Sequence, residues 1–97
     1  MSRTPIHPGE ILSDELQEIG IASTALARQL RVPENRITQI VAGKRSITAD
    51  TALRLGKWFG TTPEFWLNLQ KSYELRLAEI ELGKEIDTIP TRDTEPA

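Results

Sequence analysis

The residues best suited to chemistry in this chain are amides and cations gathered in its middle third. Asn35, Thr38 and Gln39 are spaced i, i+3 and i+4, which puts their side chains on one face of a helix. A carboxamide can form two hydrogen bonds at once with the edge of adenine, and a threonine can hydrogen-bond a base edge or contact a thymine methyl group. The spacing therefore predicts a face that can read the major groove of double-stranded DNA.

Charged and hydroxyl side chains extend this pattern on both sides. Arg36 could reach guanine or a phosphate, and Glu34 could accept a hydrogen bond from cytosine N4 or simply favour the positive N-terminal end of a helix. Residues that could hold phosphates without reading sequence are Ser23, Thr24, Arg28, Lys44, Arg45 and Ser46. Each residue alone also fits an ordinary solvated surface, but the whole set in one short stretch favours DNA binding.

The distribution of charge supports this interpretation. The net charge of the 97 residues is −2, which by itself argues against a nucleic-acid partner. Residues 1–19 carry −3, residues 20–60 carry +5 and residues 61–97 carry −4. A basic middle between acidic ends predicts one surface for a polyanion and other surfaces for a different task.

Composition excludes several other classes of protein. The chain has no cysteine and one histidine, which excludes disulfides, cysteine nucleophiles and histidine-rich metal sites. It has no apolar run long enough to span a membrane and no recognisable secretory signal. His7 is interpreted as a helix-start residue rather than a catalyst. We expect a cytoplasmic protein that is not an enzyme and needs no cofactor, metal or small-molecule ligand.

Apolar periodicity predicts the helices that must position the polar face. Helices are expected over residues 7–19, 23–30, 34–42 and 49–59, and residues 63–86 are compatible with one helix or two. Gly20, Gly43 and Gly60 supply stops, while Thr48 and Thr62 supply N-caps. The fold class is all-α: a helix-turn-helix domain with an extended C-terminal segment that is compatible with helix. Residues 1–87 form this single domain, with the motif at about 23–42, and 88–97 form a disordered tail.

The apolar residues of these helices predict the core. Two short helices joined by a three-residue turn are held by Leu26, Ala27, Leu30, Val32, Ile37 and Ile40, where Ala27 must be small. Further inward positions are Ile11, Leu12, Leu16, Ile19, Ala52, Leu53, Leu55 and Phe59. A further apolar row has the 3-4 spacing of one helix face and fits core packing or, alternatively, a dimer seam: Trp66, Leu69, Tyr73, Leu77 and Ile80. Arg54 and Lys57 are expected on an exposed face.

Four segments of the chain resemble a known family. They are His7–Leu12, Ala25–Ala27, Gly43–Leu55 without Ser46, and Pro63–Gln70. Together they resemble HigA/VapI-type antitoxins, a branch of the Cro/phage-repressor (XRE) helix-turn-helix family. The resemblance implies an all-α, five-helix Cro/phage-repressor-like helix-turn-helix domain with an extended C-terminal helix. It also implies a homodimer that binds a palindromic operator in its own promoter and neutralises a HigB-type toxin of the RelE-like, mRNA-cleaving class. It also places the base-reading helix at residues 34–42 and phosphate contacts at Lys44 and Arg45.

Two positions depart from the family pattern. Ala22 stands where the family often has serine at the start of the motif's first helix, so Ser23 or Thr24 must cap that helix or its end frays. Arg31 stands where the turn often has glycine, and a non-glycine residue in the left-handed region costs on the order of 1 kcal/mol. A stand-alone regulator without a toxin partner remains the alternative function.

Overall fold

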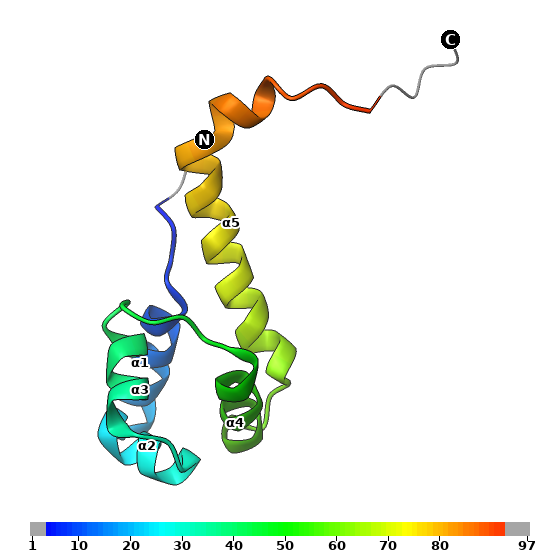
Figure 1. Ribbon diagram of the computed structural model, residues 1–97. Helices are drawn as coiled ribbons and strands as arrows, with labels where there is room; N and C mark the ends of the chain where they lie inside the picture. Colours follow the sequence, from blue (N-terminus) through cyan, green and yellow to red (C-terminus); the bar gives the residue numbers. More distant parts are fainter. Residues whose placement is uncertain (1–3, 93–97) are drawn as a thin grey trace.

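The structure is a computed structural model that describes residues 4–92, and these residues form five helices and no strand (Figure 1). The helices are α1 (Pro8–Ile19), α2 (Ser23–Leu30), α3 (Glu34–Val41), α4 (Ala49–Phe59) and α5 (Pro63–Asp87). The all-α prediction is confirmed, and the stretch left open in the sequence is one helix of 25 residues. Residues 88–92 of the predicted tail follow α5 without helix or strand, and residues 93–97 lie outside the described residues.

Helices α2 and α3 form the helix-turn-helix pair. The turn between them begins at Arg31, which has a φ of 62° and is the one non-glycine residue in 4–92 with a positive φ. The N–H of Val32 donates to the Ala27 carbonyl at 3.0 Å and closes the end of α2. Leu26 and Ala27 are fully buried, as the close crossing of the two helices requires. The N-cap residue of α2 is Ala22, and no side chain caps this helix, so neither Ser23 nor Thr24 fills that role.

The N-terminus of α1 contacts the C-terminal end of α3. His7 Nδ1 accepts a hydrogen bond from the Gly9 N–H at 2.8 Å, and the Glu10 carboxylate accepts one from the His7 N–H at 3.3 Å. This reciprocal pair is a capping box, and Pro8 occupies the first helical position. A β-carbon on Gly9 would lie 1.8 Å from the Ile40 carbonyl oxygen. Only glycine therefore allows the two helix ends to meet.

Helices α4 and α5 complete the core. Thr48 and Thr62 cap them as predicted, and Gly60 ends α4 in the left-handed region. Trp66 of α5 is 1 % exposed. Gln70 is also buried, and its side-chain oxygen accepts a hydrogen bond from the Ile47 N–H at 2.8 Å. Ile47 and Gln70 were not predicted to be inside, and together they bind the loop before α4 to α5.

Two predicted core positions are wrong, because Ile19 and Leu53 are 48 % and 60 % exposed. Ile80, for which core packing and a dimer seam were both open, is 54 % exposed and does not belong to the core. Ile19 is the last residue of α1, and Ile80 lies in the second half of α5, which extends away from the other helices (Figure 1). Leu53 lines a surface groove on the outer side of α4. Arg54 is predicted on an exposed face, and its side chain is 39 % exposed, but it also donates to the Leu30 carbonyl at 2.8 Å, a contact that the sequence did not predict. Within residues 4–92, no helix is both long enough and apolar enough to cross a bilayer.

Replacing Gly9 by alanine should destabilise the protein, because the new methyl group would overlap the backbone of Ile40. We expect the free energy of unfolding to fall by about 3 kcal/mol, the upper end of the usual cost of overpacking. The matched control is Gly83→Ala, since no atom lies within 4 Å of a β-carbon placed there. That change should raise stability by about 0.5–1 kcal/mol through helix propensity. Urea unfolding of both variants measures the difference, and equal effects would contradict the close contact of α1 and α3.

Candidate nucleic-acid interface

The outer face of α3 carries the predicted base-reading side chains. Glu34, Asn35 and Gln39 are exposed, and Thr38 is half-buried beside them. On the opposite side of the same helix, Ile37 and Ile40 are fully buried. Because these two isoleucines fix the rotation of α3 about its axis, the amides of α3 must face solvent.

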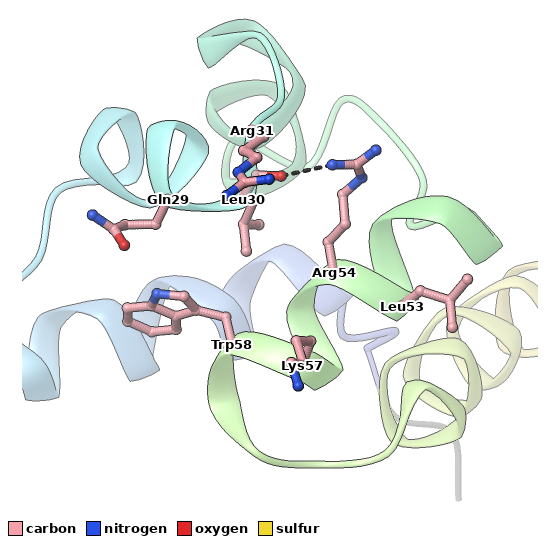
Figure 2. Close-up of a pocket in the computed structure, with 7 residues that line it drawn as sticks. All are labelled: Gln29, Leu30, Arg31, Leu53, Arg54, Lys57 and Trp58. Carbon is pink, nitrogen blue, oxygen red and sulfur yellow. Dashed lines mark hydrogen bonds between the residues drawn. The ribbon is translucent and has the colours of Figure 1, made fainter.

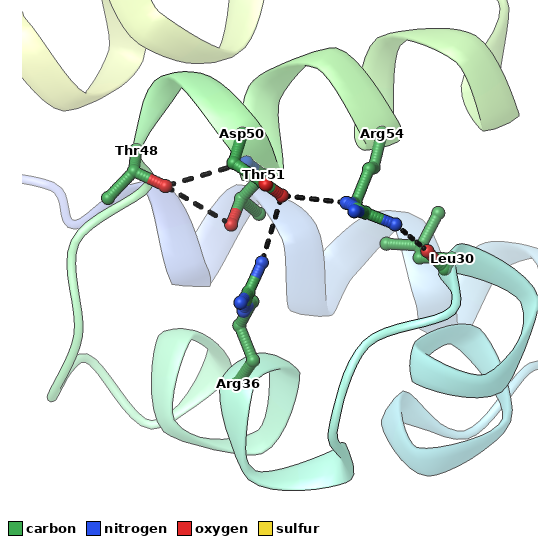
Figure 3. Close-up of polar contacts among 6 residues, drawn as sticks. All are labelled: Leu30, Arg36, Thr48, Asp50, Thr51 and Arg54. Atoms are coloured by element: carbon green, nitrogen blue, oxygen red, sulfur yellow. Dashed lines mark hydrogen bonds and ion pairs between the residues drawn. The ribbon is translucent and has the colours of Figure 1, made fainter.

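Arg36 is placed differently from the other predicted readers. Its Nη1 lies 2.9 Å from the Asp50 Oδ1 in the first turn of α4 (Figure 3). The same oxygen accepts a hydrogen bond from the Arg54 Nε at 2.6 Å. The guanidinium of Arg36 is therefore held against α4 by a carboxylate that the sequence analysis did not single out.

The basic loop after α3 presents its side chains from a fixed backbone. Lys44, Arg45 and Ser46 are all exposed. The Lys44 N–H donates to the Gln39 carbonyl at 2.8 Å, and Gly43 adopts a φ of 78° to allow that turn. With the Ile47 N–H bound to Gln70 at the other end, the backbone of the loop is anchored on both sides and starts directly beside α3.

A polar cleft of about 300 Å³ brings part of the predicted site together. Its lining residues are Arg36, Arg45, Ser46, Thr48, Asp50 and Thr51. Three of these were predicted, while Thr48 was predicted as a cap only and Asp50 and Thr51 were missed. The i, i+4 spacing of Asp50 and Arg54 is a sequence signal for their ion pair. The contact of Asp50 with Arg36 joins two helices and has no local signal.

The remaining predicted phosphate contacts lie on α2. Arg28 is exposed, and Ser23 and Thr24 are half-buried in the first turn. Because the N-cap is Ala22, the first N–H groups of α2 have no side-chain acceptor. An external anion is the kind of acceptor that such a helix start accommodates.

The capping residue His7 lies beside this interface. Its ring meets the Tyr73 ring edge-on, with centroids 4.8 Å apart. Burial lowers the pKa of His7, while the Glu10 carboxylate and a hydrogen bond with the Arg45 backbone act in the opposite direction. The neutral ring is the form that can accept the Gly9 N–H at Nδ1. His7 is thus the helix-start residue that the sequence predicted.

A second hollow contains none of the predicted DNA contacts. This groove of about 430 Å³ runs between the end of α2 and α4 (Figure 2). Its lining is Gln29, Leu30, Arg31, Leu53, Arg54, Lys57 and Trp58, and none of these is a predicted DNA contact. Within residues 4–92, no group of three or more His, Asp or Glu side chains could hold a metal ion.

Comparison with known proteins agrees with this architecture. No protein-family model matches the chain. Virulence-associated protein I of Dichelobacter nodosus is 52 % identical over 75 residues, which span 76 % of this chain and 69 % of that protein. The HigA-family addiction module antidote protein of Coxiella burnetii superposes with a TM-score of 0.90 at 54 % identity, over 93 % of this chain and 99 % of that one. Pseudomonas aeruginosa antitoxin HigA, solved with the higBA promoter, superposes with a TM-score of 0.84 at 47 % sequence identity. The match covers 95 % of this chain and 97 % of that one.

The fold and the exposed polar face of α3 define a small all-α helix-turn-helix protein. The sequence identity to the relatives above, and the share of each chain that the matches cover, then specify the family within this class. The chain belongs to the HigA family of antitoxins. The family resemblance seen in the four sequence segments is confirmed.

The stability of the fold should depend on pH through His7. Because its pKa is lower in the folded than in the unfolded chain, the unfolded chain binds the proton more readily. The contribution of the cap is therefore complete above pH 6.5, the ordinary histidine pKa, and is lost as the pH falls below it.

Unfolding free energies measured between pH 5 and pH 8, on the wild type and on His7→Asn, test this linkage. Asparagine can cap a helix but does not titrate in this range, so the variant should lack the histidine-dependent part of the loss. Identical pH profiles for the two proteins would contradict the role of neutral His7.

Proposed function

We propose that this chain is a homodimeric, sequence-specific repressor that binds a palindromic operator in its own promoter. The observation that carries this proposal is the outward setting of Asn35 and Gln39 on a helix whose other side is buried. The Pseudomonas aeruginosa relative was solved with the higBA promoter, and we extend promoter binding to this chain. The protein acts in the cytoplasm by binding rather than by catalysis, and it requires no cofactor.

Base reading is assigned to the outer face of α3. Asn35 and Gln39 form paired hydrogen bonds with adenine edges, Thr38 contacts a neighbouring base, and Glu34 accepts from cytosine. Phosphates are held by Ser23, Thr24, Arg28, Lys44, Arg45 and Ser46. In a symmetric dimer the two copies of α3 enter successive major grooves about 34 Å apart. The unit that does this is the single domain of residues 1–87.

We also propose that the protein neutralises a HigB-type, RelE-like mRNA-cleaving toxin by forming a complex. The surface assigned to this task is the second half of α5. It exposes the apolar side chains of Leu75, Leu82 and Ile86. Between residues 74 and 87 it also carries five carboxylates against two cations. Exposed apolar side chains among acidic ones suit a basic protein partner. The acidic residues 10–18 of α1 are a less suitable surface, because they lack a comparable row of exposed apolar side chains.

Asn35→Ala and Gln39→Ala should each weaken binding to the duplex from upstream of this reading frame by about 1–3 kcal/mol and relax base preference. The physical reason is the loss of two hydrogen bonds to a base edge. Matched controls are Asn68→Ala on α5 and Gln17→Ala on α1, which remove the same exposed amides from other helices. Gel shifts at several salt concentrations provide the affinities.

Binding of the wild type should weaken steeply as salt rises, because phosphate contacts release counterions. The slope should be the same for Asn35→Ala, since asparagine contributes no charge. If neither α3 substitution changes the affinity, the assigned face is wrong.

Co-expression with the protein of the neighbouring reading frame should test the second proposal. The wild type should relieve the growth arrest which that protein causes. Glu81→Lys with Glu85→Lys should abolish relief by placing cations opposite a basic partner. Glu15→Lys with Glu18→Lys, the matched change on α1, should retain it. Failure of the wild type to relieve arrest would favour a stand-alone regulator without a toxin.

A further inference from the structure

The carboxylate of Asp50 is the centre of a row of contacts that connects α2, α3 and α4. Asp50 Oδ1 accepts from Arg36 of α3 at 2.9 Å and from Arg54 of α4 at 2.6 Å. Arg54 in turn donates from Nη1 to the Leu30 carbonyl, at the end of α2, at 2.8 Å. Figure 3 shows this continuous row of contacts from α2 to α3.

Asp50 is well placed to remain an anion. It occupies the first turn of α4, where the helix dipole favours negative charge. The hydrogen bond from Arg54, followed by the charges of Arg54 and Arg36, lowers the pKa of Asp50. The carboxylate is therefore ionised throughout the physiological range and holds both arginines.

The contact is exposed, so its main effect is on geometry rather than stability. The side chains of Arg36 and Asp50 are 30 % and 54 % exposed. Exposed ion pairs contribute little to folding, because water screens them. They still select one position of a long side chain, and here Arg36 is drawn toward α4 and away from the face of Asn35 and Gln39.

Carboxylate and phosphate oxygens compete for the same guanidinium donors. The cleft that contains Asp50 also contains Arg45, Ser46 and Thr48, so it lies within the predicted phosphate-binding region. Arg36 is the one cation of α3 itself. If it were free, it could bind any nearby phosphate and add affinity that does not depend on base sequence.

We propose that Asp50 is a specificity-determining residue that acts by positioning Arg36. Its carboxylate takes the place of a phosphate and keeps Arg36 out of contact with DNA, so that discrimination between operators rests on Asn35, Thr38 and Gln39. This inference rests on the proposed DNA-binding function. It also assigns Arg36 a different role from the base-reading one suggested by the sequence.

A double-mutant cycle of Arg36→Ala and Asp50→Asn tests the proposal. The probes are the duplex from upstream of this reading frame and a scrambled duplex of the same composition. Asp50→Asn should raise affinity for both probes, and more for the scrambled one. The plot of log affinity against log salt concentration should become steeper by about one released counterion. Arg36→Ala should change wild-type affinity less than about threefold, but should lower the affinity of Asp50→Asn about tenfold.

Asp14→Asn on α1 is the matched control for loss of one negative charge, and it should leave the ratio of the two affinities unchanged. Asp50→Ser provides a second variant if Asp50→Asn does not fold, as judged by circular dichroism. NMR adds a readout that a purely structural role would not change: the Arg36 Nε–Hε signal should stay in place when duplex is added to the wild type and should shift in the Asp50 variants.

The outcomes separate this inference from the function on which it rests. If the effects of the two substitutions are additive, or if Asp50→Asn binds more weakly than the wild type, the positioning role is overturned. The proposed function still holds in that case, provided that the wild type binds the upstream duplex. A movement of the Arg36 signal on binding of wild-type protein would also overturn the positioning role. A wild type that binds neither duplex would refute the proposed function and the inference together.

Discussion

The orientation of α3 depends on the contact between Gly9 and the carbonyl of Ile40. Helix α3 has eight residues, and isolated helices shorter than about 12–15 residues are marginal in water, so its position comes from packing. Gly9 lets the N-terminus of α1 meet the C-terminal end of α3, and His7 and Glu10 hold that N-terminus in its cap. The direction of the amides and the start of the basic loop depend on this support together with the buried side chains of Ile37 and Ile40.

Polar contacts then position the charges around α3. Gln70 binds the loop backbone at Ile47, and the row of contacts from Leu30 through Arg54 and Asp50 reaches Arg36. Among the described residues, no buried side-chain polar atom lacks a partner. The basic residues in the middle of the chain lie on or between α2 and α4, while most carboxylates of the C-terminal third lie on α5. This separation lets one small domain present a surface for DNA and another for a protein.

Much of the fold could be predicted because local signals were strong. Threonine caps predicted the starts of α4 and α5, Gly60 predicted the end of α4, and apolar spacing predicted the buried faces of α2 and α3. The exposure of Leu53 could not be predicted, because its position on α4 matters only once α5 has taken the other side. The contacts of Arg36 with Asp50 and of Ile47 with Gln70 join residues 14 and 23 positions apart, so only the tertiary fold creates them.

The central claim is that the outer face of α3 meets the edges of DNA bases. NMR titration of the isotopically labelled protein with duplex DNA from its own upstream region tests this most directly. The account predicts that the side-chain amide signals of Asn35 and Gln39 shift most strongly, together with the backbone of Lys44 and Arg45, while those of Asn68 and Gln17 stay in place. Shifts confined to α5, with the α3 amides unchanged, would contradict it.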